Sequence, residues 1–216
     1  MIGQPYKRDA DDAALVAEFD ALPDEARTGD YWSLTRVDGF KAKAKAFYIT
    51  AQDRRCCYCT KEIVSDNKRM WDLDHVLSRD KCPEYMFVSE NLAISCVDCN
   101  IAKSAKDVAK GKAYKNFPRR SSSYRIVHPH FDIYDEHIRV FAGLIYVPVG
   151  GSKKGRETIT VCNLSRYGDV FQGKMGAVCD TRYEADVAQL LFATERDEAL
   201  AAARKLLTAF DDGPLA

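Results

Sequence analysis

The sequence predicts an α+β fold with a small core closed by a metal ion, and three observations support this expectation. Two Cys-x-x-Cys pairs, Cys56/Cys59 and Cys96/Cys99, are separated by 36 residues. Apolar residues alternate with polar ones around Asp74-His75, between the two pairs, which is typical of a strand. A helical pattern follows the second pair, and a longer one lies near the C-terminus. The core is therefore expected between the two cysteine pairs.

The elements around this core divide the chain into three expected segments. Residues 1–52 form an N-terminal helical segment, residues 53–110 the core, and residues 111–216 a C-terminal α/β extension with a hairpin and a long helix. The first segment contains a short helix at 13–19 and a second helix that Ser33 can cap and that runs to about Ala51. Strand-like spacing is expected at 71–76, and residues 91–94 lead into the second cysteine pair. A helix then runs from Val97 to about Lys110, followed by a loop at 117–123. The last elements are a strand at 139–149, a turn at 150–155, a partner strand at 158–161 and a helix from Tyr183 to Phe210.

The two cysteine pairs predict a structural zinc site. A two-residue spacer lets both sulfurs of a pair face one ion, and two pairs can complete a tetrahedral set of four thiolates. Such a set leaves no open coordination position, so this zinc would hold the core together rather than react. Redox-active cysteines are the alternative. The remaining cysteines lack a partner pattern and are expected to be incidental thiols: Cys57, Cys82, Cys162 and Cys179.

A second, catalytic site is predicted inside the cysteine frame. Hydrolysis of a phosphodiester requires an activated water and compensation of the charge on the phosphate. His75 can accept a proton near neutral pH, and Asp74 and Asn100 offer oxygen ligands of the kind that Mg²⁺ or Mn²⁺ prefers. Alone, an Asp-His pair is usually an ordinary surface or core pair, and a lone Asn is usually a turn or cap residue. Their order within the frame favours the catalytic interpretation.

Residues 56–106 resemble the HNH endonucleases, the ββα-metal nuclease family. The resemblance rests on Cys56-Cys-Tyr-Cys59, Leu73-Asp74-His75, Glu90-Asn91-Leu92 and Cys96-Val-Asp-Cys99-Asn100-Ile-Ala-Lys103. It implies a ββα core in which His75 is the general base, Asn91 orients the hairpin and the histidine backbone, and Asn100 and Asp74 hold the catalytic metal. The family often has His where this chain has Asn100. Lys103, one helical turn further on, is expected either to contact phosphate or to be a solvated charge.

Basic residues are concentrated beside the expected site. The chain as a whole has 32 basic and 32 acidic residues and no net charge. Residues 101–125, however, contain eight basic side chains and one acidic one, whereas residues 1–30 contain three basic and eight acidic side chains. A basic surface of this kind favours binding to a nucleic-acid backbone. The expected contacts to DNA are Lys103, Lys106, Lys110, Arg119 and Arg120.

Two further motifs lie beyond the core. Residues His128 to His137 are dense in histidine and carboxylate groups, and a hydrogen-bonded structural corner is favoured over a second catalytic cluster. Together with the phrase Thr160-Val-Cys-Asn163-Leu164-Ser-Arg166, this order of motifs is similar to that of HNH subunits of Septu and retron-linked anti-phage systems. That second, weaker resemblance implies an ATPase subunit as partner.

The favoured function is therefore a metal-dependent DNA endonuclease in defence or restriction. No apolar segment suits a signal peptide or a membrane span, and eight cysteines suggest a reducing compartment, so a cytoplasmic protein with no membrane partner is expected. Two alternatives remain: a non-catalytic zinc module that binds nucleic acid or protein, and a nuclease subunit that is silent until its ATPase binds. A homing or mobile-element nuclease would need a sequence-reading element, and none is recognisable.

Overall fold

The computed structural model describes residues 2–65, 67–111, 114–141, 143–168, 186, 189–190 and 193–211. The elements are α1 (Ala10–Asp20), α2 (Asp38–Ala51), β1 (Trp71–His75), β2 (Leu92–Cys96), α3 (Val97–Lys103), β3 (Ile138–Phe141), β4 (Ile145–Pro148), α4 (Lys153–Val161) and α7 (Arg196–Asp211), joined by short 3₁₀ turns. Helices and two small sheets confirm the predicted α+β class. None of the described helices is long and apolar enough to cross a membrane.

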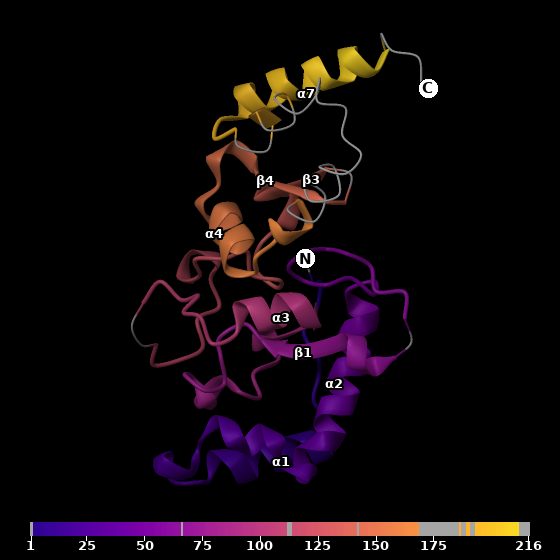
Figure 1. The fold of residues 1–216 in the computed structure, drawn as a ribbon. Helices are drawn as coiled ribbons and strands as arrows, with labels where there is room; N and C mark the ends of the chain where they lie inside the picture. The colour runs from indigo at the N-terminus through magenta and orange to yellow at the C-terminus, as the bar shows by residue number, and fades with distance from the viewer. Residues whose placement is uncertain are drawn as a thin grey trace.

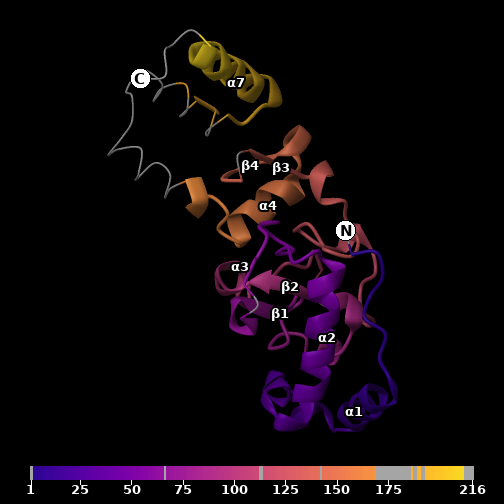
Figure 2. The ribbon, with the colours of Figure 1, turned by 90° about the vertical axis from the view of Figure 1, so that its right-hand side faces the viewer.

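The elements are arranged along one long axis (Figures 1 and 2). Helix α1 lies at one end, α2 and the β1–β2 hairpin with α3 lie in the middle, and the β3–β4 hairpin, α4 and α7 lie toward the other end. The expected division into 1–52, 53–110 and 111–216 stays a prediction.

Helix α2 packs against one face of the central hairpin. The capping box of Asp9 and Asp12 begins α1. Helix α2 begins at Asp38, and Val37 before it offers no side-chain cap, so the expected cap at Ser33 is wrong. The chain forms two 3₁₀ turns instead, at Gly29–Ser33 and Thr35–Val37, separated by the extended residue Leu34. The first of these turns buries Tyr31 and Trp32 in the core.

The central hairpin presents two different faces. Strands β1 and β2 pair antiparallel, with Asp74 opposite Ala93 and His75 opposite Leu92. Because successive side chains on a strand point to opposite faces, Trp71, Leu73 and His75 share one face, and Asp72 and Asp74 share the other. Trp71 and Leu73 belong to the core under α2, whereas Asp72 and Asp74 contact α3 through Asn100 and Lys103.

Helix α3 is shorter than predicted. It ends at Lys103, because Ser104 adopts a left-handed φ of +46° and the chain then turns away. The expected continuation to Lys110 is therefore wrong, and Asp107 does not share a helical face with Asn100 and Lys103. Residue Val108 is buried instead, and its carbonyl accepts a hydrogen bond from the Arg125 amide at 2.8 Å.

The C-terminal half differs most from the expectation. The strand predicted at 139–149 is itself a hairpin, β3–β4, in which Ile138 pairs with Pro148. The strand predicted at 158–161 is part of helix α4, which Ser152 caps by accepting the Gly155 amide. The β-branched run at 158–161 favours a strand locally, but the cap and the burial of Thr158 against the Val127 amide outweigh that preference.

The long helix predicted from Tyr183 to Phe210 is not continuous where it is described. Residues 193–195 are not helical, and α7 starts at Arg196. Residues 183–185, 187–188 and 191–192 of that prediction, and also Cys179, lie outside the described residues.

Two hydrophobic clusters flank the central hairpin. One joins α1, α2 and the aromatic residues Trp32, Trp71 and Phe87, and the other joins the cysteine-rich loop to residues 108–164. Cys57 packs against both clusters. The hairpin that carries Asp74 and His75 therefore lies at the boundary between the two clusters.

Gly155 lets α4 approach the start of β3, and we predict that Gly155→Ala destabilises the protein. A Cβ at residue 155 would overlap the carbonyl oxygen of His137. Relief of this overlap requires a backbone shift that costs about 1–3 kcal/mol. Gly39→Ala, in α2, is the matched control, since nothing lies within 4 Å of its added Cβ. Denaturant unfolding of both variants measures the difference, and equal stabilities would contradict the close approach.

Candidate metal centre and catalytic cleft

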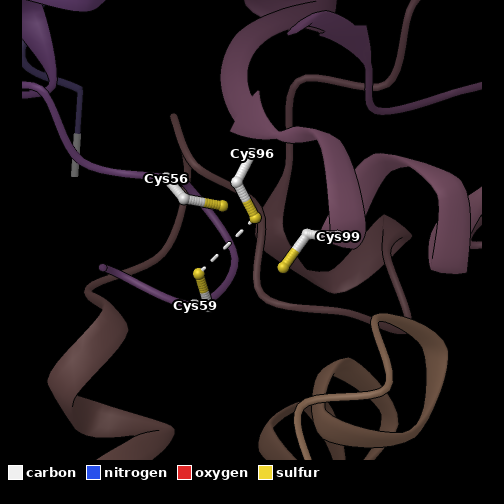
Figure 3. Close-up of side chains that lie close together, drawn as sticks. All are labelled: Cys56, Cys59, Cys96 and Cys99. Atoms are coloured by element: carbon white, nitrogen blue, oxygen red, sulfur yellow. Dashed lines mark hydrogen bonds between the residues drawn. The ribbon is translucent and has the colours of Figure 1, made fainter. Parts of the chain in front are cut away.

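Four cysteine sulfurs meet beside the central hairpin (Figure 3). Cys56 and Cys59 lie on the turn after α2, Cys96 ends β2, and Cys99 lies in the first turn of α3. All four sulfurs lie within 4.8 Å of one another, and those of Cys59 and Cys96 are 3.9 Å apart. A tetrahedral zinc ion with Zn–S bonds of about 2.3 Å requires sulfur separations near 3.8 Å. The geometry of the cluster is compatible with zinc, as the spacing predicted.

Backbone hydrogen bonds shape the turn that carries the first cysteine pair. The Cys56 amide donates to the Lys61 carbonyl at 3.1 Å, and the Thr60 amide donates to the Cys56 carbonyl at 2.9 Å. Thr60 has a left-handed φ of +57°, which closes the turn. The Cys57 amide donates to the Ile94 carbonyl at 3.0 Å and thereby ties the turn to β2. The two pairs are therefore held in register by the fold.

The negative charge of four adjacent thiolates requires a cation to balance it. Hydrogen bonds from Cys56, Cys59 and Cys99 hold the pKa of Cys96 far below its usual range. The pKa values of the other three are raised, for Cys56 mainly by burial and for Cys59 and Cys99 mainly by neighbouring thiols that compete for the same negative charge. Four adjacent thiolates can form together only around a positive ion, which zinc supplies.

A second site lies at the end of β1. Asp74, His75, Asn100 and Lys103 line one cavity of about 280 Å³, together with Ser78 and Arg79 of the following loop. The structure thus brings three of the predicted catalytic residues, Asp74, His75 and Asn100, into one cleft. The fourth, Asn91, lies behind the cleft and is fully buried.

The imidazole of His75 is held in one orientation. Its Nε2 lies 3.0 Å from the carbonyl oxygen of Met86, and because a carbonyl only accepts, Nε2 carries the proton. Trp32 packs edge-on against the ring, with centroids 4.5 Å apart. Burial and the charge of Arg79 lower the pKa of His75 to about 3. The ring is therefore neutral at neutral pH, and Nδ1 is its unprotonated nitrogen.

The carboxylate of Asp74 is buried between two donors. The Tyr58 hydroxyl donates to one oxygen at 2.6 Å, and the Lys103 ammonium lies 3.2 Å from the other. Burial raises the pKa of Asp74, and Lys103 and Tyr58 oppose this rise. The Lys103 ammonium also donates to the His75 carbonyl at 2.9 Å. Lys103 is only 1% exposed, so it is not the solvated charge that the sequence suggested, and its contact with phosphate stays a prediction.

The two asparagines are placed differently. The Asn100 amide nitrogen donates to Asp72 at 2.9 Å, which turns its amide oxygen away from that carboxylate. The Asn91 side chain accepts the Leu77 amide at 2.7 Å and donates to the Leu77 and Tyr85 carbonyls, each at 3.1 Å. Asn91 therefore fastens the loop that follows His75 to the loop that precedes β2.

The remaining predicted DNA contacts are exposed at the surface. Lys106 lines a neighbouring cavity that shares Ser78 with the cleft, and its ammonium donates to the Val161 carbonyl at 3.0 Å. Arg119 forms an ion pair with Glu90 at 2.8 Å. Lys110 and Arg120 are exposed.

The motif from His128 to His137 forms a hydrogen-bonded corner. Asp132 accepts the His128 amide at 2.7 Å and contacts Lys154, and His130 donates to the Leu92 carbonyl at 2.8 Å. His137 lies 2.8 Å from the Ser152 hydroxyl. These contacts brace β2 and α4, whereas the cavity that Asp74 lines has none of these histidines among its lining residues.

The sequence did not reveal three residues that line the cleft or contact its side chains. Tyr58 lies within the first cysteine pair but was treated only as a spacer. Trp32 reaches His75 from the N-terminal segment, and Arg79 follows His75 by four residues on a loop. Only the proximity of Arg79 to the Asp-His pair is a signal in the sequence, because the other two contacts depend on the fold.

Comparison with known proteins shows a distant similarity to a curated protein. The Septu protein PtuB of Bacillus thuringiensis is 26% identical to this chain over 126 residues, which cover 58% of this chain and 42% of that protein. The chain thus spans less than half the length of the relative that it matches. No model of a protein family matches the chain.

Removal of the metal from the four-cysteine site should abolish cooperative folding of the core. Structural zinc contributes on the order of 10 kcal/mol to folding in small zinc domains, which is comparable to the whole stability of a domain. We expect chelation of the zinc-loaded protein, and the variant Cys96→Ser, to remove the thermal transition seen by circular dichroism. Cys82→Ser, outside the cluster, is the control. An unchanged melting temperature after verified zinc removal would refute a structural zinc.

The buried ammonium of Lys103 should be a major source of stability. Lys103→Met removes the charge that neutralises Asp74 and leaves the His75 carbonyl without its donor. Breaking a buried pair in this way costs about 3–5 kcal/mol. Lys110→Met, at an exposed position, should change the free energy of unfolding by less than about 0.5 kcal/mol. Urea unfolding compares the two, and a small effect at Lys103 would show that the pair is not formed in solution.

Proposed function

We propose that this chain is a metal-dependent endonuclease that hydrolyses phosphodiester bonds in DNA. The main support for the proposal is that Asp74, His75 and Asn100 line one cavity beside a four-cysteine cluster. A neutral imidazole with a fixed tautomer, a carboxylate and an amide oxygen are the groups that hydrolysis of a phosphodiester requires. The resemblance of residues 56–106 to HNH endonucleases supports the same assignment.

His75 acts as the general base. Its Nε2 proton is held by the Met86 carbonyl, so Nδ1 is the nitrogen that accepts a proton from water. Trp32 restrains the ring from the side, and burial keeps it unprotonated. A positioned general base typically contributes about 10²- to 10⁴-fold to the rate.

Asp74 and Asn100 would hold Mg²⁺ or Mn²⁺, the hard cations that match a carboxylate and an amide oxygen. When bound, such an ion compensates charge on the phosphate and on the leaving oxygen. Tyr58 and Lys103 position the Asp74 carboxylate, and Lys103 also holds the His75 backbone through its carbonyl. Asn91 positions the loop that carries Arg79.

The DNA backbone would follow the basic surface next to the cleft. Arg79 lines the cleft itself; its Nε makes no hydrogen bond among the described residues and lies 3.7 Å from the Asp80 carboxylate, so we assign its guanidinium to the phosphate at the site of cleavage. Lys106, Lys110, Arg119 and Arg120 are exposed and supply sequence-independent contacts further along the strand. We expect the protein to act in the cytoplasm, where eight cysteines stay reduced.

The similarity to the Septu protein PtuB favours a role in anti-phage defence. The motifs that resemble Septu and retron-linked HNH subunits favour an ATPase as partner. In that case the chain is a nuclease subunit that is silent until the ATPase binds, and the absence of net charge agrees with a modest affinity for free DNA.

Plasmid cleavage by the zinc-loaded protein with Mg²⁺ or Mn²⁺ tests the proposal. We expect wild type to nick or linearise the plasmid, and His75→Ala to lose at least about 10²-fold in rate. His137→Ala, a histidine outside the cleft, should cleave like wild type. Zinc content and melting temperature must match among the three proteins.

The outcomes separate the alternatives. Equal cleavage by wild type and His75→Ala would overturn the assignment of the base. No cleavage by wild type alone, followed by cleavage after addition of an ATPase encoded beside it, would establish the partner-gated subunit. No cleavage in either condition would favour the zinc module without nuclease activity.

A further inference from the structure

The segment that follows α4 returns to the four-cysteine cluster. The guanidinium Nη2 of Arg166 donates to the sulfur of Cys99 at 3.2 Å, and the hydroxyl of Tyr167 donates to the sulfur of Cys59 at 3.6 Å. These two neighbours in sequence thus reach one cysteine of each Cys-x-x-Cys pair. They lie more than 60 residues beyond the last cysteine of the cluster.

Arg166 is fixed in place by several contacts. Its Nη1 donates to the carbonyls of Cys162 and Asn163 at 2.7 and 2.6 Å, which anchors the guanidinium to the end of α4. Its Nη2 also donates to the Tyr167 hydroxyl at 2.8 Å, and its Cζ lies 4.3 Å from the centroid of the Tyr167 ring. The left-handed backbone of Asn163, with φ of +48°, turns the chain so that this approach is possible.

Tyr167 is held from the side of the first cysteine pair. The ammonium of Lys61 lies 3.3 Å from the centroid of its ring, and the Tyr146 ring lies 5.8 Å from it, centroid to centroid. The hydroxyl of Tyr146 donates to the Cys59 carbonyl at 2.8 Å. Strand β4, the end of α4 and the cysteine turn therefore meet at one point.

The charge of the metal centre gives a physical reason for the donors and cations around it. Four thiolates around a divalent cation have a net charge of −2, and this charge is partly buried here. Hydrogen-bond donors and cations around such a set lower the negative charge on the sulfurs and stabilise the ligand geometry. Arg166 and Lys61 bring two positive charges to the cluster, and Arg166 and Tyr167 bring the donors.

We propose that Arg166 and Tyr167 complete the metal centre as hydrogen-bond donors to its thiolates, so that retention of the ion depends on a segment far from the cysteines in sequence. In the same way, the ion holds the end of α4 and the β3–β4 hairpin against the core. This inference is independent of the proposed nuclease activity. It also assigns a role to Arg166, in the motif from Thr160 to Arg166 that no catalytic role explains.

Competition for the metal tests the proposal on the full zinc-loaded chain. Zinc transfer to the chromophoric chelator 4-(2-pyridylazo)resorcinol gives the affinity and the release rate. Loss of an outer hydrogen bond to a metal ligand typically lowers metal affinity by about 10- to 100-fold. We expect a loss in this range for Arg166→Gln and a smaller loss for Tyr167→Phe, which removes only the hydroxyl. Arg156→Gln, at an exposed position of α4, is the control and should match wild type.

A spectroscopic measurement distinguishes a role at the metal from a role in folding. In the Co²⁺-substituted protein, both variants should shift the thiolate-to-cobalt charge-transfer band, because the donors polarise the sulfurs directly. Tyr167→Phe keeps this test available if Arg166→Gln does not fold. The proposal is overturned if every variant that folds keeps the wild-type band and a zinc affinity within threefold of wild type. In that case Arg166 serves only as a cap for α4.

Discussion

The convergence of four sulfurs within 4.8 Å is the constraint on which the rest of this structure depends. It joins the end of α2 to the junction of β2 and α3. Since β1 pairs with β2, this junction also determines where β1 places Asp74 and His75. Asn100 follows the last cysteine directly, so its position on α3 is set by the same junction. A metal centre that takes no part in the chemistry can therefore determine the geometry of the proposed catalytic site.

The cleft itself is organised around a buried cation that the protein supplies. The Lys103 ammonium neutralises Asp74 and satisfies the carbonyl of His75, so the cleft is electrostatically balanced without an added ion. A divalent cation that enters must compete with this ammonium for the carboxylate. The Lys103–Asp74 ion pair therefore stabilises the cleft without a divalent cation and would lower its affinity for the proposed catalytic metal.

Sequence reasoning succeeded where the chemistry is local and failed where it depends on packing. The spacing within each Cys-x-x-Cys pair almost determines its geometry, and the order of Asp74, His75 and Asn100 predicted a shared cleft. The strand predicted at 158–161 failed because a cap at Ser152 and the burial of Thr158 outweigh the preference of β-branched residues. The exposure of Lys103 could not be predicted, since charged residues on a short helix are normally solvated. The contact of Trp32 with His75 joins distant segments and leaves no local signal.

The side chains of His75 and Asp74 face two different parts of the protein core. The His75 ring faces the cluster of α1 and α2 through Trp32, whereas Asp74 faces the cysteine-rich cluster through Tyr58 and Lys103. Adjacent residues on one strand therefore take their surroundings from opposite sides of the hairpin. His75, the proposed base, packs against the Trp32 ring, while the Asp74 carboxylate accepts a hydrogen bond from the turn that carries Cys56 and Cys59. Because Tyr58 lies inside that turn, its hydrogen bond links the four-cysteine cluster directly to Asp74.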